Sequence, residues 1–415
     1  MNKYLSFIKF ANYAVFLLAI ISLPFHWRLA NILLLVWLLL WVCEGRFFKR
    51  SNMRPLREFL PSLLCLTLVL LEVISLCWAD NQAAAHAVIE RHIGFMVLPL
   101  VCIFGVNERY NSQQMFTALA ASAVCSVFYY LFSLYWVENV NYVMFWTNDL
   151  NNLYINEGGI TMQMKHKLFY CITLCVALCG LPSVYMYYRH RFPRWQVRLT
   201  VFVAALILIG GITLTFSRAG IFSMIIILVV MVIIQLRDRK RIIATLSALL
   251  LLLLFFLFYP RIDELKDDPR MHEWQSAWNS KSQIPFFGKG AGQEVDFMLE
   301  AYQRDGYEQG IENSFGPHNQ YISTTINLGY IGLVLLVALL FVIPFLYKGK
   351  VRKTAVLISI LYGITMLTDD VLLRIDPLFT LMITLVILQT WQHCESTTHP
   401  ISKPSQSAPC ATGNQ

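Results

Sequence analysis

The stretch FGPHNQ at residues 315–320 leads directly into the apolar run YISTTINLGYIGLVLLVALLFVIPFLY at 321–347. A run of this length can cross a bilayer as a helix, because a helix rises about 1.5 Å per residue and the hydrocarbon core is about 30 Å thick. The polar segment 260–320 precedes it and follows another apolar block at 242–259. The largest polar segment is therefore predicted to lie between two membrane spans, at one membrane face.

The composition is that of a membrane protein. Hydrophobic residues make up 57% of the 415 residues and charged residues only 14%, whereas about 25% of the residues of a soluble protein are charged. The apolar residues gather in blocks that must be helical, because the bilayer core offers no water to satisfy the backbone. We predict an all-α polytopic membrane protein with about twelve spans. The predicted spans are 8–24, 29–43, 59–78, 92–106, 115–136, 168–187, 199–214, 221–236, 242–259, 321–347, 354–367 and 377–391.

The distribution of Lys and Arg predicts the orientation. These residues gather in four short loops, at 46–57, 189–198, 237–241 and 348–353. With twelve spans all four loops lie on one side, which the positive-inside rule assigns to the cytoplasm. Both termini are then cytoplasmic. The net charge of +8 follows from these loops and does not indicate nucleic-acid binding.

The spans divide the chain into four regions. Residues 1–259 hold the first nine spans, with a smaller loop on the outer side near 137–167. Residues 260–320 form the large outer loop, which we expect to be partly helical and to contain the site. Residues 321–392 hold the last three spans, and 393–415 form a tail that we expect to be disordered. The large loop has more acidic than basic residues, so particular arginines would have to hold any bound anion.

His318 is the first candidate for catalysis. Pro317 fixes the chain just before a predicted helix, so His318 should lie near a helix N-terminus. The helix dipole disfavours imidazolium there, which predicts a lowered pKa and a neutral side chain able to act as a general base. A histidine that only caps the helix at the water interface would occupy the same position.

Arg218 is a candidate for binding an anion. It lies between the apolar runs 199–214 and 221–236, where an arginine is costly unless it is paired or hydrated. Its planar guanidinium suits phosphate, and the small residues Ala219 and Gly220 beside it would let a bulky headgroup approach. The alternative is a turn whose arginine extends to water.

Arg270 is the second arginine of interest. If the segment around it is helical, Arg270 and Trp274 lie on the same face. The run at 285–292 follows, and its glycines would permit a tight loop with exposed amides. Such a loop is weak evidence for phosphate binding, and because it lacks the Lys-Ser/Thr ending it is not a P-loop. The alternative for Arg270 is a surface ion pair with Asp267 or Glu273.

Several further polar residues lie in or beside the spans. Asp369 and Asp370 could orient a base or bind a sugar hydroxyl, or they could form a solvated turn paired with Arg374. Glu72, inside the third span, and Arg91, beside Glu90 at the predicted start of the fourth, are typical of structural polar contacts. No metal-site motif, nucleophile elbow or nucleotide fingerprint is present.

Three stretches resemble the O-antigen ligase family, which belongs to the superfamily of O-antigen ligases and polymerases. His318-Asn319 is followed by nine residues and then by Gly329-Tyr330-Ile331-Gly332, which resembles the family pattern His-[Asn/Ser/Gln]-x9-Gly-x-x-[Gly/Thr/Tyr]. The other stretches are Ser217-Arg218-Ala219-Gly220 and Arg270-x-x-x-Trp274 with Pro285-x-x-Gly288-x-Gly290. Both of these are shared with O-antigen polymerases and protein O-oligosaccharyltransferases.

The resemblance implies a glycosyltransferase of the bacterial inner membrane. Its donor would be O-antigen glycan on undecaprenyl diphosphate, and its acceptor a sugar hydroxyl of lipid A–core at the periplasmic face. The reaction would invert the anomeric centre and need no cofactor or metal. His318 would be the base, and Arg218 and Arg270 would stabilise the leaving diphosphate. Further substrate contacts are expected from Asn319, Trp274, Arg91 and Asp369. The alternatives are an O-antigen polymerase and, from another class, a membrane transporter.

Overall fold

A computed structural model describes residues 2–46, 56–137, 166–236 and 268–398, together with residues 240, 243 and 247. These residues form helices, turns and loops without a strand. Eight of the described helices are long and apolar enough to cross a membrane, and two shorter apolar helices lie at Trp27–Cys43 and Phe59–Ser75. The predicted all-α polytopic membrane fold is confirmed.

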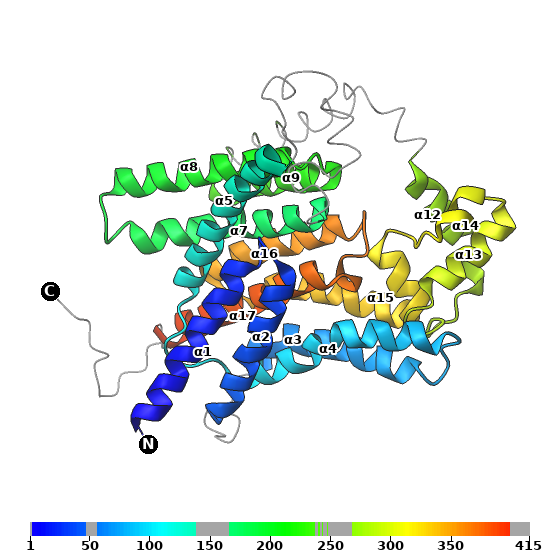
Figure 1. Cartoon of the computed structure of the whole chain (residues 1–415), viewed down its shortest axis with the longest axis horizontal. Helices are drawn as coiled ribbons and strands as arrows, with labels where there is room; N and C mark the ends of the chain where they lie inside the picture. The colour runs from blue at the N-terminus through cyan, green and yellow to red at the C-terminus, as the bar shows by residue number, and fades with distance from the viewer. Residues whose placement is uncertain are drawn as a thin grey trace.

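The long helices form a bundle, and three short helices project from one end of it (Figure 1). The bundle helices are α1 (Asn2–Ser22), α2 (Trp27–Cys43), α3 (Leu56–Ser75), α4 (Gln82–Phe104), α5 (Ser112–Val137), α7 (Lys167–Tyr188), α8 (Arg194–Thr213), α9 (Arg218–Gln235), α15 (Gln320–Leu346), α16 (Gly349–Thr365) and α17 (Ile375–Thr398). The projecting helices are α12 (Pro269–Asn279), α13 (Glu294–Asp305) and α14 (Glu308–Asn313). Two 3-10 turns, η5 (Lys281–Gln283) and η6 (Val371–Leu373), complete the described elements.

Every predicted span except 242–259 corresponds to a bundle helix. The span at 242–259 lies outside the described residues, apart from the isolated positions 243 and 247. Most of the loop predicted near 137–167 and the first residues of the loop 260–320 also lie outside them. α17 continues past 392 to Thr398, so the start of the predicted tail is helical.

The predicted start of the fourth span was wrong. α4 begins at Gln82, where the Asn81 side chain accepts a hydrogen bond from the Ala84 N–H at 3.1 Å. Arg91 therefore lies inside the helix instead of at its beginning. The neighbouring residue His92 is buried, and the Glu72 carboxylate of α3 lies 2.7 Å from its Nδ1. The predicted span left out the segment 82–91 because it contains His86, Glu90 and Arg91, which are exposed on the helix surface.

α17 and α7 form the centre of the bundle. In the apolar part of each helix that could cross the membrane, 94% of the residues are buried in α17 and 89% in α7, whereas only 22% are buried in α9. α9 has the higher mean hydropathy, 2.4 against 1.2 for α17, because a helix that faces lipid must be apolar around its surface. The polar residues of α17 are instead satisfied internally, as where Gln389 donates to the Cys102 carbonyl at 2.8 Å.

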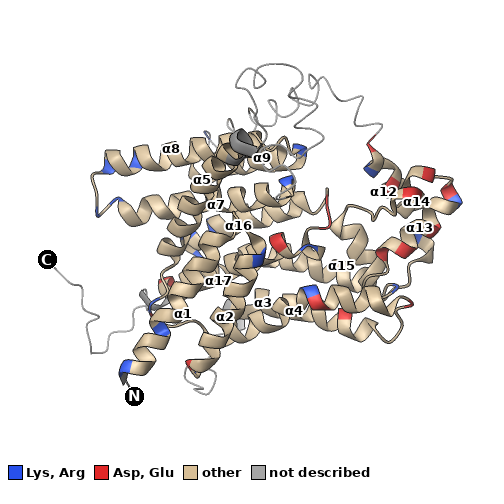
Figure 2. Ribbon diagram, viewed as in Figure 1, with Lys and Arg blue, Asp and Glu red and all other residues tan. Residues whose placement is uncertain are grey.

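The two ends of the bundle differ in charge. Lys and Arg gather at the turn between α7 and α8, whereas Asp and Glu are concentrated on α12, α13 and α14 (Figure 2). We call the end that holds the α7–α8 and α15–α16 turns the basic end. The opposite end, where α12 to α14 project, is called the His318 end. α7, α9 and α15 all run from the His318 end towards the basic end.

α15 is broken at Gly329, so the predicted continuous helix 321–347 was wrong. Gly329 has a φ of 67° and a ψ of −164°, and a Cβ at this position would collide with the Phe286 carbonyl oxygen. The break frees backbone groups that pair with the segment 285–292. Lys289 N donates to Ile326 O at 2.7 Å, and Tyr330 N donates to Phe286 O at 3.1 Å.

The same pairing shows that the glycine-rich run 285–292 is not a phosphate loop. The Gly290 N–H donates to Asn327 O at 2.9 Å, and the Ala291 N–H donates to Ser75 Oγ at 2.9 Å. Its glycines serve close packing, because a Cβ at Gly290 would lie 2.5 Å from the Ala79 Cβ. The prediction of exposed amides was therefore wrong, and the run joins the large loop to α3 and α15.

Candidate active site

α12 is the element that gathers the candidate residues. Its N-cap is Asp268, whose carboxylate accepts a hydrogen bond from the Arg270 N–H at 3.1 Å, and Pro269 follows in the first turn. The other Asp268 oxygen lies 4.0 Å from Nη1 of Arg218, the first residue of α9. Asp268 therefore brings the starts of two helices together, and with them the two predicted arginines.

His318 is paired with a carboxylate of α12. Its Nδ1 lies 3.0 Å from Oε2 of Glu273, whose side chain is 1% exposed while that of His318 is 30% exposed. A carboxylate only accepts hydrogen bonds, so in the neutral imidazole Nδ1 carries the proton and Nε2 keeps its lone pair. The pair therefore fixes the tautomer that a general base needs.

The predicted direction of the His318 pKa was wrong. The hydrogen bond that His318 donates to Glu273 raises the pKa of His318, burial opposes this, and the negative charges of Glu273, Asp369 and Asp370 raise it further. The carboxylates outweigh the helix dipole because they lie close to a half-buried imidazole. His318 is thus a stronger proton acceptor than expected, and it is neutral only at a higher pH.

The backbone around His318 is held by two further predicted residues. Trp274 Nε1 donates to the Pro317 carbonyl at 3.0 Å. Asn319 is the N-cap of α15, where its Oδ1 accepts from the N–H groups of Tyr321 and Ile322 at 3.0 and 3.2 Å. His318 itself has a φ of 41°, a region that costs a non-glycine residue about 1 kcal/mol.

The expected position of His318 near a helix N-terminus is confirmed, and Asn319 instead of His318 caps the helix. The Asn319 Nδ2 donates to Leu367 O at 3.1 Å. All polar atoms of the Asn319 side chain are therefore engaged within the protein. The strained backbone at His318 is fixed from α12 on one side and from the end of α16 on the other.

Asp369 and Asp370 do not form a solvated turn. They are 5% and 6% exposed, and the part of the chain that the structure describes contains no ion pair between them and Arg374. The Ser323 hydroxyl donates to Asp370 Oδ1, and Asp369 Oδ1 accepts from the Asp370 N–H at 2.8 Å. Burial raises the pKa of Asp370 to about 7, although the Ser323 hydrogen bond opposes the rise.

A third cation lies near the two arginines. The charges of Arg270 and Arg218 both act on Lys167, the first residue of α7. The three side chains come from the first turns of α7, α9 and α12, whose dipoles also favour an anion. Among the described residues, no carboxylate lies within ion-pair distance of the Arg270 guanidinium. Glu273 contacts His318 instead, and Asp267 lies outside the described residues.

Gly220 has a different role from the one predicted. It is buried, and a Cβ there would lie 2.5 Å from the Cys171 Sγ of α7. The glycine therefore permits α9 to pack closely against α7, which brings Arg218 beside Lys167. It does not provide space for a bulky headgroup.

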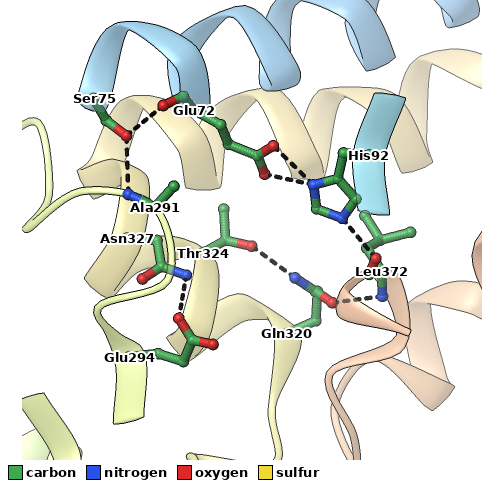
Figure 3. A network of polar contacts seen from close by, with 9 residues as sticks. All are labelled: Glu72, Ser75, His92, Ala291, Glu294, Gln320, Thr324, Asn327 and Leu372. Carbon is green, nitrogen blue, oxygen red and sulfur yellow. Dashed lines mark hydrogen bonds and ion pairs between the residues drawn. The ribbon is translucent and has the colours of Figure 1, made fainter. Parts of the chain in front are cut away.

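A buried polar network supports the site from within the bundle (Figure 3). His92 lies between Glu72 and the Leu372 carbonyl oxygen, 2.7 Å from its Nε2. The Leu372 N–H donates to Oε1 of Gln320 at 2.7 Å, and Gln320 follows Asn319 directly. The buried Glu72–His92 pair confirms the structural role predicted for Glu72, and it connects α3 and α4 to the start of α15.

Arg91 is not brought to His318 by any contact between described residues. Its side chain is exposed on α4, and its charge acts on Glu294 at the start of α13. The structure therefore groups His318, Arg218, Arg270 and Trp274 around α12 and leaves Arg91 at the edge of the same end. Glu273 and Lys167 belong to the group, although the sequence did not identify either as a site residue.

Residues 203–337 match the family model described as O-antigen ligase. The matched region contains the start of α9, α12 and the first part of α15, and thus both arginines, Glu273 and His318. The resemblance seen in the sequence motifs is thereby confirmed. The curated proteins contain no match to the chain.

Proposed function

From the O-antigen ligase match, we propose that this membrane glycosyltransferase moves O-antigen glycan from undecaprenyl diphosphate to a sugar hydroxyl of lipid A–core. The match supports the superfamily of O-antigen ligases and polymerases. The observation that carries the proposal is the His318–Glu273 pair beside three cations at one end of a membrane bundle. We place this end at the periplasmic face of the bacterial inner membrane, with both termini in the cytoplasm, because the opposite end carries the basic turns.

His318 acts as the general base in this proposal. The acceptor hydroxyl donates its proton to Nε2 while its oxygen forms a bond to the anomeric carbon. The bond from that carbon to the diphosphate oxygen breaks, and the diphosphate leaves with the electron pair. This direct displacement inverts the anomeric centre. Glu273 stabilises the imidazolium that results, because its carboxylate accepts the hydrogen bond from Nδ1.

Arg218, Arg270 and Lys167 stabilise the leaving diphosphate. Its negative charge grows as the bond breaks, so positive groups already held in place bind the transition state better than the ground state. The two arginines can each donate two parallel hydrogen bonds to phosphate oxygens, while Lys167 adds a point charge. These side chains supply the stabilisation without a metal.

The remaining candidate residues receive more specific roles. Trp274 and Asn319 position the His318 backbone through the hydrogen bonds described above. Asp369 acts electrostatically, because its negative charge raises the pKa of His318. Arg91 is exposed on α4 and can contact the acceptor. The lipid tails of both substrates stay in the bilayer, beside helices whose apolar surfaces face outward.

The test is an assay with purified protein, lipid-linked glycan and lipid A–core, with and without a chelator. We expect glycosylated lipid A–core in both conditions, and none from His318→Ala. His272→Ala is the matched control, because His272 is exposed on α12 and stacks on Tyr307, with ring centroids 5.1 Å apart. Full activity of His318→Ala would refute the base assignment.

The same assay separates the ligase from its nearest alternative. A polymerase would use a second lipid-linked glycan as acceptor, so it would lengthen the donor glycan without lipid A–core. The Ser-Arg-Ala-Gly and Arg-x-x-x-Trp motifs are shared with polymerases, which favours this second candidate over any other. Products longer than the donor glycan in the absence of lipid A–core would therefore identify a polymerase.

A further inference from the structure

The basic end contains an apolar groove far from His318. The groove has a volume of about 650 Å³ and lies between α7, α8, α9 and α16, within the size range of sites that bind small ligands. Its walls are aliphatic and aromatic. They include Leu178, Val201, Phe202, Leu228, Met231 and Leu357.

Four basic side chains line the mouth of this groove. Arg189 and Arg198 come from the α7–α8 region, and Lys350 and Lys353 come from the first turns of α16. Among the described residues, no acidic side chain lines the groove. The four charges therefore favour an occupant with an anionic group at the mouth and an apolar part inside.

A second, more polar cavity adjoins the groove. It has a volume of about 480 Å³, and Gln113, His190, Arg191 and Glu395 are among the residues that line it. The two cavities share Ser183, Met186, Lys350 and Trp391. An apolar groove that opens into a polar cavity matches a molecule with a hydrocarbon chain and a polar headgroup.

Ser183 gives an independent indication of a ligand at this junction. Its side chain is 2% exposed, and its hydroxyl has no hydrogen-bond partner within the described residues. A buried hydroxyl without a partner costs free energy, and a bound molecule at this junction would supply the missing partner. The phosphate or ester oxygens of a lipid would accept this hydrogen bond.

The groove is too far from His318 to hold the same lipid headgroup. α7 has 22 residues, so at about 1.5 Å per residue its two ends lie about 33 Å apart. Lys167 is at the His318 end, whereas Ser183 and Arg189 are at the other end. A lipid in the groove would therefore belong to the other leaflet.

We propose that the groove binds an anionic diacyl phospholipid from the leaflet at the basic end. One acyl chain lies between α8, α9 and α16, and the phosphate contacts the four basic side chains. The polar part of the headgroup occupies the second cavity beside Ser183. The positive-inside rule explains basic residues in these turns, but it does not explain an apolar groove between them or a buried hydroxyl without a partner.

The experiment is native mass spectrometry of the detergent-solubilised full chain with phosphatidylglycerol or with phosphatidylcholine of the same chain length. We expect one tightly retained phosphatidylglycerol and much weaker binding of phosphatidylcholine. Equal retention of the two lipids would overturn the proposal. Preferential retention of a polyprenyl phosphate over phosphatidylglycerol would also overturn it.

Two variants test the location. Each Lys or Arg near an anionic headgroup contributes about fivefold to binding, so Arg189→Gln with Lys353→Gln should weaken phosphatidylglycerol binding about 25-fold. Arg194→Gln with Lys348→Gln is the matched control, because both residues are exposed in the same two turns and neither lines the groove or the second cavity. An equal loss in the control would show general surface attraction and overturn the proposal.

A third variant keeps every charge. Ala205 lines the groove, and Ala205→Trp should fill the space for the acyl chain and remove the retained lipid. If the filled variant kept phosphatidylglycerol as tightly as the unmodified protein, the groove would not be the binding site.

Discussion

Replacing Glu273 by Gln isolates the electrostatic part of the His318 site. The amide is nearly the same size as the carboxylate and can keep a hydrogen bond to Nδ1, but it carries no charge. The Glu273 hydrogen bond is the largest cause that raises the pKa of His318. The substitution should therefore lower this pKa, and the neutral base should persist to a lower pH.

The expected size follows from the geometry. A hydrogen bond to a charged group contributes about 1.5–3 kcal/mol, and about 1.4 kcal/mol corresponds to one pH unit. The His318 side chain is 30% exposed, and solvent screening reduces the effect. We expect the acidic limb of the rate profile to move down by about one pH unit.

The rate on the plateau should fall at the same time. The Gln side chain can also present its NH2 group to Nδ1, which selects the tautomer with the proton on Nε2. That tautomer cannot accept the proton of the acceptor hydroxyl, so we expect a loss of about 10- to 100-fold in kcat/KM. The two effects together distinguish an electrostatic role from a purely structural one.

The assay measures ligation by the purified protein between pH 5 and 9. Glu300→Gln is the control, because it removes the same charge from an exposed position on α13, and its profile should be unchanged. An acidic limb that stays in place or moves to higher pH in Glu273→Gln would refute the proposed His318–Glu273 coupling.

Three further predictions concern other parts of the site. Arg218→Lys should lower kcat/KM at least tenfold in the same assay, because an ammonium cannot donate two parallel hydrogen bonds to phosphate; an unchanged value would indicate a structural arginine. Gly329→Ala should lower the melting temperature in detergent, because Gly329 has a φ of 67° and its Cβ would collide with Phe286 O. Gly210→Ala should not lower it, because no atom lies within 4 Å of the added Cβ. Asp370→Asn should raise the melting temperature at pH 8 and not at pH 4. The buried carboxyl titrates at about 7 instead of 3.8, which corresponds to about 4 kcal/mol of preference for the neutral form. The folded protein with Asp370 thus loses stability as the pH rises from about 4 to about 7; an equal difference between the variants at both pH values would contradict this.

Most of the bundle could be predicted because spans are local in sequence. The apolar runs at 199–214 and 221–236 correspond to α8 and α9, since hydropathy depends only on neighbouring residues. The start of α4 was missed because the segment 82–91 contains the polar residues His86, Glu90 and Arg91, which stay exposed on the helix surface. The break in α15 also escaped prediction, since its backbone partners lie at 285–292.

The site residues likewise fall into those that a local motif reveals and those that only a tertiary contact reveals. His318, Arg218 and Arg270 were found because each belongs to a short motif. Glu273 was not, because it lies 45 residues from His318 in sequence and the contact depends on how α12 packs. The predicted pKa direction was wrong for the same reason, since this one tertiary contact outweighs the local helix dipole.

The hydrogen bonds between the run at 285–292 and α15 near Gly329 hold the large loop in place. The residues proposed to react, such as His318, lie outside this join. The hydrogen bonds of this join are made mainly by backbone N–H and C=O groups, and only proline lacks the N–H. Exposed side chains of α13 and α14 that take no part in such contacts can therefore be exchanged without loosening the join. The same backbone framework would then present different side chains to glycans of different structure, while His318, Arg218 and Arg270 keep their positions.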